Sequence, residues 1–244
     1  MTSTILLIAF AAAAATLVGG ALALRLRDKL HLVLGFSAGA IIAVAFFDLL
    51  PESLELAAGF HDTGTILLAT ALGFFGYVVL DRLIVLHTHH DGEDGVHAHA
   101  KTRGWIGAGS LSGHSFLDGF AIGVAFQASS AIGLIVAAAV LTHDFSDGIN
   151  TVNLVLKNGG SRREAFRWLI ADAAAPVIGA AVTLFFVFPA SLLSLVLGTF
   201  AGFFLYIGAA DLLPESHHAH PKFLTTCMTL LGAAVLYGAI RIAG

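Results

Sequence analysis

The chain has 244 residues, of which 57% are hydrophobic and only 11% charged, and its formal net charge is −4. Its mean hydropathy of +0.89 lies far outside the average for soluble domains and excludes that class of protein. A single cysteine, Cys227, excludes an internal disulfide and a cysteine-rich metal site. We therefore expect an integral membrane protein in which any bound metal ion has nitrogen and oxygen ligands.

Apolar stretches of about twenty residues, the length that a helix needs to cross ~30 Å of hydrocarbon, occur eight times along the chain. They lie near residues 5–24, 32–50, 65–86, 105–127, 131–156, 165–188, 191–213 and 223–242. No basic segment precedes the first stretch, so we expect an uncleaved span rather than a signal peptide. The connectors are short except for residues 87–104, which leaves no room for an appended soluble module. We predict an all-α polytopic membrane protein with eight transmembrane helices in one domain, residues 1–244.

The basic residues predict the orientation of these spans. Lysines and arginines gather in or beside the first, third, fifth and seventh connectors, and Arg241 alone lies on the other side. By the positive-inside rule the odd-numbered connectors are cytoplasmic. We therefore expect both termini to be extracytoplasmic.

An internal repeat links the second and the seventh span. Residues 34–53 read LGFSAGAIIAVAFFDLLPES and residues 197–216 read LGTFAGFFLYIGAADLLPES, with ten of twenty positions identical at a constant offset of 163. The two spans run in opposite directions, so the repeat is inverted, as in many secondary transporters. The predicted arrangement is 3+2+3, in which spans 1–3 match spans 6–8 and enclose spans four and five. Three glycine pairs at helical spacing predict close helix contacts: Gly35/Gly39, Gly198/Gly202 and Gly119/Gly123.

The enclosed spans four and five each carry the pattern His-x-Phe-x-Asp-Gly. His114 and Asp118 are four residues apart, as are His143 and Asp147, so each pair lies on one helical face. Asp144, three residues before Asp147, can join that face. Two facing helices would then offer two imidazoles and three carboxylates.

These groups favour a cation site. An ionised carboxylate near the bilayer centre costs roughly 2.5–3.5 kcal/mol on insertion scales, and a divalent cation would compensate it. Imidazole and carboxylate ligands, with Ser115 as a weak oxygen ligand, suit Zn²⁺ better than Ca²⁺ or Mg²⁺. Five ionisable groups would also allow two ions with shared carboxylates. The alternative is that the His and Asp side chains pair to hold the helices together, or form a proton relay.

The two motifs resemble those of the ZIP (Zrt-, Irt-like protein) family of metal transporters, whose fourth span carries His-Asn-x-x-Asp-Gly and whose fifth carries a His-Glu-x-Pro segment. Ser115 stands at the family's Asn, Asp147 replaces a longer Glu or His, and Ala175 precedes Pro176 where some members have a Glu-Pro pair. The resemblance implies import of Zn²⁺, or of iron, manganese or cadmium, through a bacterial cell membrane by alternating access. It also implies an elevator-like movement of spans one, four, five and six against the others. The implied metal ligands are His114, Ser115, Asp118, His143, Asp144 and Asp147, with Asp172 as a substitute for the missing Glu.

Two further groups of residues are candidates for a role in transport. Asp48 and Glu52 end span two, and Asp211 and Glu215 end span seven; they line an entrance and an exit, or are solvated helix ends. The connector 87–104 is a cytoplasmic metal-binding or sensing loop, or a solvated segment with incidental metal affinity. Its histidines are His87, His89, His90, His97 and His99.

Two other functions compete with metal transport. An intramembrane metal-dependent hydrolase could use the same ligands to activate water, but no His-Glu-x-x-His motif is present in the sequence. A proton-coupled carrier of a non-metal solute could use them as a relay. We favour a transporter rather than an enzyme, with divalent metal ions and the bilayer as partners, no catalytic cofactor and no nucleic acid. The sequence leaves a homodimer open.

Overall fold

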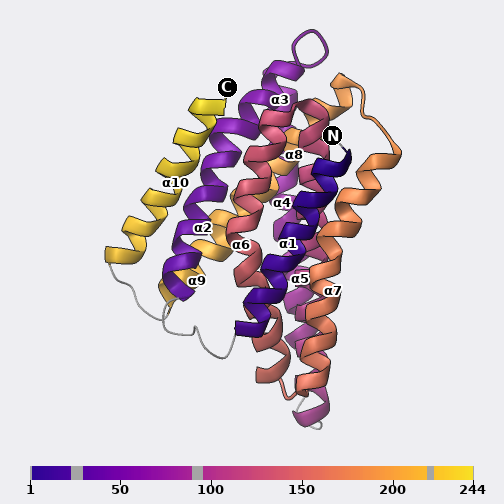
Figure 1. Cartoon of the computed structure of the whole chain (residues 1–244), viewed down its shortest axis with the longest axis vertical. Coiled ribbons are helices and arrows are strands. Elements are labelled where there is room, and N and C mark those ends of the chain that lie inside the picture. The colour runs from indigo at the N-terminus through magenta and orange to yellow at the C-terminus, as the bar shows by residue number, and fades with distance from the viewer. Residues whose placement is uncertain (1, 23–29, 90–95, 219–222, 244) are drawn as a thin grey trace.

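The computed structural model describes residues 2–22, 30–89, 96–218 and 223–243, and every regular element in this part of the chain is a helix (Figure 1). The α-helices are α1 (Thr2–Leu22), α2 (Leu30–Val44), α3 (Leu50–Leu56), α4 (Thr63–His89), α5 (Val96–Ala128), α6 (Ser130–Lys157), α7 (Arg162–Val182), α8 (Ala190–Tyr206), α9 (Leu213–His218) and α10 (Phe223–Ala243). Shorter turns η1 (Ala45–Leu49), η2 (Thr183–Phe185) and η3 (Ile207–Leu212) continue α2, α7 and α8.

The predicted all-α membrane fold is confirmed. Within the described residues, seven helical segments are long and apolar enough to cross a membrane, and they correspond to all the expected spans except the fourth. Span four lies in α5, which has 33 residues but also carries His114, Asp118 and several serines and glycines. These small and polar residues lower its apolar character, and His114, Ser115 and Asp118 among them are buried.

The inverted repeat has a structural counterpart that the sequence did not predict. In both copies the α-helix widens into a π-helical segment, η1 before Pro51 and η3 before Pro214. Proline lacks an amide hydrogen and its ring clashes with the carbonyl group four residues earlier, so a regular α-helix cannot continue there. The two widened turns contain Asp48 and Asp211, and such turns are frequent at functional sites.

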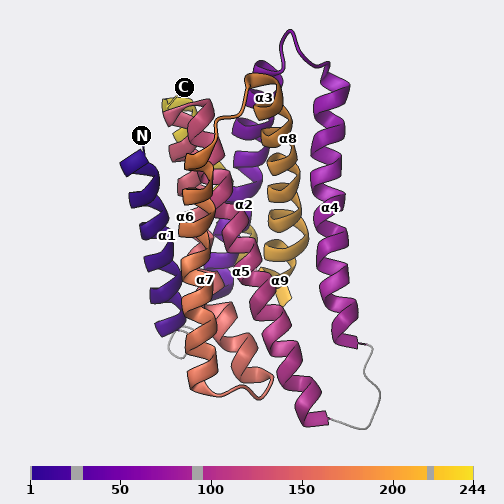
Figure 2. The ribbon, with the colours of Figure 1, turned by 90° about the vertical axis from the view of Figure 1, so that its right-hand side faces the viewer.

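The helices form two bundles, and each bundle contains helices from both copies of the repeat. In the first bundle α1 packs on α6 and α7, and α5 packs on α6 and α7; in the second α2 packs on α10, and α8 packs on α4 and α3. Figure 2 shows α1 and α7 on one side of the molecule and α4 beside α8 on the other. This division matches the two groups of spans that the family resemblance implies.

Reciprocal glycine contacts join the helix pairs within each bundle. In the pair α2–α10 a Cβ at Gly39 would overlap the backbone of Thr229, and one at Gly232 would overlap that of Phe36. The same reciprocal contact recurs in α1–α6, α5–α7 and α4–α8, through Gly19 and Gly148, Gly119 and Gly179, and Gly73 and Gly202. The predicted close contacts of paired glycines are thus confirmed at Gly39, Gly119 and Gly202. Small residues that let helix backbones touch are the main packing device inside a membrane.

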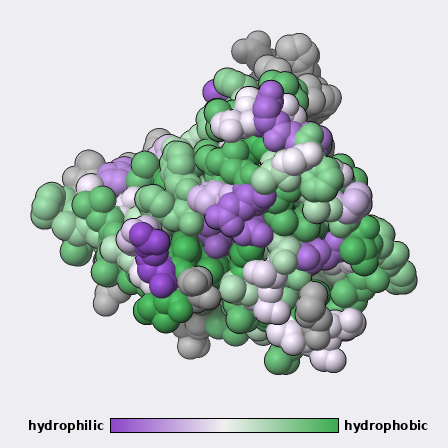
Figure 3. All heavy atoms as spheres, turned by 90° about the horizontal axis from the view of Figure 1, so that it is seen from above, coloured by the Kyte–Doolittle hydropathy of each residue, from purple (hydrophilic) through white to green (hydrophobic). Residues whose placement is uncertain are grey.

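One end of the molecule is basic. Helix α6 ends there at Lys157 and α7 begins there at Arg162, and Lys101 near the start of α5 pairs with Glu164 on α7, whereas α1 begins and α10 ends at the opposite end (Figure 1). We call these the basic end and the terminal end. Seen from the terminal end, hydrophobic residues cover most of the rim and hydrophilic residues gather in separate patches (Figure 3). The basic residues Arg25, Arg27, Lys29 and Lys222 lie outside the described residues.

The predicted connector 87–104 is shorter than expected. Helix α4 continues to His89 and α5 already begins at Val96, so the described ends of this connector are helical. His87 and His89 therefore belong to α4, and His97 and His99 to α5, whereas His90 lies outside the described residues. The prediction relied on apolar stretches, and the residues by which α4 and α5 extend beyond those stretches are mostly polar.

Candidate metal centre

Four of the predicted ligands converge between α5 and α6. One ligand atom from each of His114, Asp118, His143 and Asp147 lies within 4.8 Å of the other three, and all four side chains are buried. Asp118 Oδ2 lies 3.2 Å from Nε2 of both histidines, and Asp147 Oδ2 lies 3.8 Å from His114 Nε2 and 3.7 Å from His143 Nε2. Ligands at 2.0–2.1 Å around a tetrahedral Zn²⁺ are about 3.3 Å apart, and the four His–Asp distances of 3.2–3.8 Å lie near this value.

Each histidine has a partner for its second ring nitrogen. His143 Nδ1 lies 3.2 Å from the carbonyl oxygen of Ala139, which can only accept a hydrogen bond. His114 Nδ1 lies 2.8 Å from the hydroxyl oxygen of Tyr77 on α4. A hydrogen on Nδ1 in both contacts leaves Nε2 to bind a cation, the arrangement that is common for metal-binding histidines.

Tyr77 is a candidate functional residue that the sequence analysis missed. It reaches His114 from the other bundle, and its ring also contacts Phe203 and Tyr206. Its only signal in the sequence was a polar aromatic residue within an apolar span, which is common at membrane interfaces and did not stand out.

Two of the predicted ligands bond to each other instead. Asp172 on α7 accepts hydrogen bonds at 2.8 Å from Ser115 Oγ on α5 and at 2.8 Å from Thr151 Oγ1 on α6. Asp172 is fully buried and does not belong to the group of four. This carboxylate ties three helices of one bundle together.

Several buried carboxylate oxygens at the site have no hydrogen-bond partner among the described residues. Both carboxylate oxygens of Asp144 and Oδ2 of Asp147 are buried without a hydrogen-bond partner in the described part of the chain. Asp144 is adjacent to the group of four but not a member. Buried polar atoms in native proteins are nearly always paired, so these oxygens are suited to a cation.

A cavity connects the site with the basic end. It has a volume of about 710 Å³ and extends from His114 and Asp147 to Lys157. Asp211 and Glu215, the predicted exit residues, line it and are exposed. Asn150 and Asn153 also line the cavity. They follow Asp147 on α6 at intervals of three residues, a polar spacing that the sequence analysis did not use.

The predicted entrance residues lie elsewhere. Neither Asp48 nor Glu52 lines this cavity. Asp48 is buried, with Oδ2 unpaired within the described residues, whereas Glu52 is half-buried.

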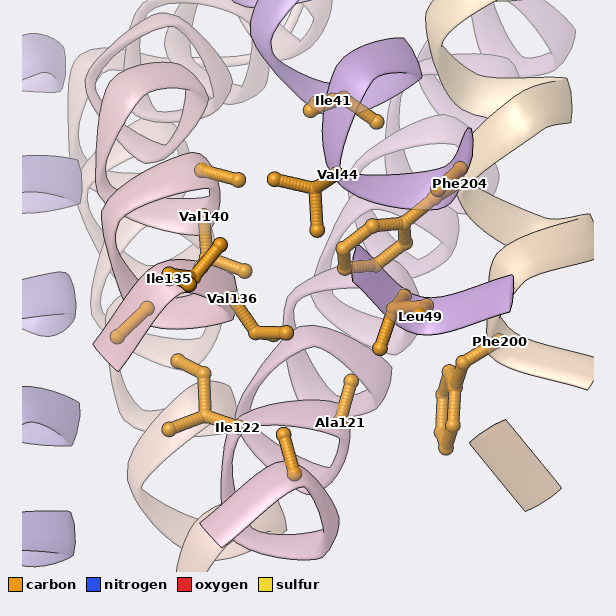
Figure 4. Close-up of a cluster of buried hydrophobic side chains, with 14 of the residues drawn as sticks. Ile41, Val44, Leu49, Ala121, Ile122, Ile135, Val136, Val140, Phe200 and Phe204 are labelled. Carbon is orange, nitrogen blue, oxygen red and sulfur yellow. The ribbon is translucent and has the colours of Figure 1, made fainter. Parts of the chain in front are cut away.

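Apolar side chains close the route from the site to the terminal end. Figure 4 shows this cluster, to which both bundles contribute. From the first bundle come Ala121, Ile122, Ile135, Val136 and Val140, and from the second Ile41, Val44, Leu49, Phe200 and Phe204. Residues 121–122 follow the His114 motif on α5 toward the terminal end, and residues 135–140 precede His143 on α6. The centre is thus open toward one end of the molecule and sealed toward the other.

Fold and site together define a class: a polytopic membrane protein with an inverted repeat and a buried His/Asp centre that opens to one side. The family model described as ZIP Zinc transporter matches residues 86–239, which include both motifs. The chain belongs to this family.

Relatives in bacteria and eukaryotes are similar to the chain. Zinc transporter ZupT of Corynebacterium aurimucosum is 27% identical over 239 residues, which cover 91% of this chain and 90% of that protein. Zinc transporter YKE4 of Saccharomyces cerevisiae is 24% identical over 65% of this chain, and zinc transporter ZIP10 of Danio rerio is 32% identical over 47%. The chain spans 51% of the length of the yeast protein and 14% of that of the zebrafish protein.

Proposed function

We propose that the chain transports divalent transition metal ions across the membrane toward the cytoplasm, with Zn²⁺ as its preferred substrate. The observation that carries this proposal is the group of four buried ligand atoms, which lies beside a cavity that extends toward the basic end. The basic end is cytoplasmic by the positive-inside rule, with both termini on the other side. The names of the relatives, all zinc transporters, support the same substrate.

One ion bound by His114, Asp118, His143 and Asp147 is the occupancy that we propose. Ser115 donates a hydrogen bond to Asp172, and Asp172 is not a member of the group of four, so we assign neither residue to the ion. Asp144, with two unpaired oxygens, is the reserve ligand that can shift toward the ion during entry or release.

Alternating access follows from the packing of the two bundles. Glycine contacts hold the helix pairs within each bundle backbone to backbone, whereas larger apolar side chains fill the boundary between the bundles. Sliding along that boundary leaves each bundle intact, which supports movement of α1, α5, α6 and α7 against the other helices. Asp211 and Glu215 would then receive the ion on its way to the cytoplasm.

The test is uptake of radiolabelled zinc by liposomes that contain the purified chain. The double variant His114→Ala with His143→Ala is expected to reduce uptake to the level of empty liposomes. His61→Gln is the matched control, because His61 bonds the carbonyl oxygen of Ser191 away from the site and glutamine keeps a donor. Uptake by a folded double variant at the rate of the control would refute the proposal. Competition with iron, manganese and cadmium gives the order of preference.

A further inference from the structure

A second cavity lies on the surface of the first bundle, at the basic end. It has a volume of about 440 Å³ between α1, α6 and α7, and its walls are almost wholly apolar, with Leu17, Ala21, Leu156, Phe166 and Ile170 among them. Phe166 is 60% exposed and Ile170 is 45% exposed. From Arg162 to Ile170 the groove follows α7 for about 12 Å at a rise of 1.5 Å per residue. It is separate from the metal centre and its cavity.

One basic residue forms the rim of this groove. Arg162 lines it, is exposed, and has no ion pair or side-chain hydrogen bond with any described residue. The nearby carboxylate of Glu164 is already bound by Lys101 at 2.7 Å and by Ser161. Within the described part of the chain, the positive charge of Arg162 at the rim of the groove is therefore left without a carboxylate partner.

We infer that this groove binds a phospholipid with a net negative headgroup. The apolar walls accommodate an acyl chain, and the guanidinium of Arg162 donates hydrogen bonds to the headgroup phosphate. A zwitterionic lipid offers the same phosphate but also a positive group that cancels the attraction. Basic residues beside pockets between transmembrane helices on the cytoplasmic side are suited to anionic lipids.

The groove touches the helix that carries half of the metal centre. Val152 and Leu156 line it, and they follow Asp147 on α6 by about one and a half and two and a half turns. A lipid held there contacts α1, α6 and α7, all of the first bundle, and none of the second. Its binding can be measured without transport, so the inference stands or fails independently of the proposed function.

The test compares binding of phosphatidylglycerol and phosphatidylcholine to the purified full chain by native mass spectrometry. Arg162→Gln is compared with Arg163→Gln, the neighbouring exposed arginine that does not line the groove. Ala21→Phe, at an exposed position of the wall, fills the groove. We expect one phosphatidylglycerol to bind in preference to phosphatidylcholine, and Arg162→Gln to weaken it about fivefold, the effect of one basic residue at a membrane surface. Arg163→Gln is expected to change binding less than twofold, and Ala21→Phe to weaken both lipids.

Three results would overturn the inference. Equal binding of the two lipids would show that the headgroup charge plays no part. Equal losses of lipid binding in Arg162→Gln and Arg163→Gln would show that the lipid does not bind specifically at the groove. A dimer that dissociates in Ala21→Phe would show that a second copy of the chain occupies the groove. If Ala21→Phe does not fold, the two arginine variants still decide the question.

Discussion

The contact between Tyr77 and His114 predicts a loss of metal affinity when one hydroxyl group is removed. Tyr77→Phe keeps the ring contacts with Phe203 and Tyr206 and deletes only the oxygen 2.8 Å from His114 Nδ1. Loss of such an orienting partner weakens metal binding by 10–100-fold in other sites. A neutral phenol orients a histidine less strongly than a carboxylate does, so we expect the lower limit, about tenfold or ~1.4 kcal/mol.

The assay is competition for Zn²⁺ between the purified chain and a chelating dye. Tyr237→Phe is the matched control, because the hydroxyl oxygen of Tyr237 accepts its hydrogen bond from Arg241 at the terminal end of α10. Its zinc affinity should equal that of the parent. If Tyr77→Phe is folded and also binds zinc with the affinity of the parent, Tyr77 does not orient His114 as a ligand and the reasoning is wrong.

Helix contacts, the connector at residues 183–188 and the histidine-rich connector each predict the outcome of a substitution. Gly73→Ala should destabilise the chain by about 1–3 kcal/mol in thermal or detergent unfolding, because its Cβ would overlap the backbone of Thr199, whereas Gly76→Ala, which meets open space, should not. Gln127→Ala removes three hydrogen bonds to residues 183–188 and should cost about 1–3 kcal/mol and speed proteolysis of that connector; unchanged cleavage would contradict this. Replacing the five histidines of the histidine-rich connector by asparagine should leave zinc uptake by liposomes intact, and complete loss of uptake in a folded variant would refute a modulatory role. The five histidines are His87, His89, His90, His97 and His99.

Much of the fold followed from local signals in the sequence. Apolar length marked the spans, and the repeated Asp-Leu-Leu-Pro-Glu-Ser block related the two halves of the chain. The widened turns η1 and η3 did not follow, because proline excludes a regular helix but does not determine whether the chain kinks, breaks or widens. The helical ends of the connector 87–104 were missed because a helix can extend beyond the membrane without an apolar face.

The candidate site divides in the same way. Helical spacing was enough to bring His114 toward Asp118 and His143 toward Asp147, since each pair needs only one helix. The bonds of Asp172 could not be predicted, because Ser115 and Thr151 lie on two other helices whose rotation about their axes the sequence does not reveal. The contact of Tyr77 with His114 could not be predicted either, because it depends on how the two bundles pack against each other.

The unpaired oxygen of Asp48 connects the inverted repeat with the balance between two conformations. Asp211, its repeat partner, is exposed in the cavity at the basic end, whereas Asp48 is buried at the other end of the molecule. If the two halves exchange roles, Asp48 becomes exposed in the opposite conformation. Burial of an unpaired carboxylate oxygen costs on the order of 1–3 kcal/mol, so this residue disfavours the present conformation. Asp48→Asn should therefore shift the population toward the form that is open at the basic end.

The shift can be measured in a Cys227→Ser background with a reporter, Asn153→Cys, in the cavity at the basic end. A membrane-impermeant thiol reagent applied from that side should label the reporter faster in the presence of Asp48→Asn. The matched comparison is Glu52→Gln, one turn further along the same span and already half-buried, which should change the labelling rate less. Because the reagent reports only the open fraction, a slower or equal rate with Asp48→Asn would mean that the buried carboxylate is stabilised in place and does not disfavour this conformation.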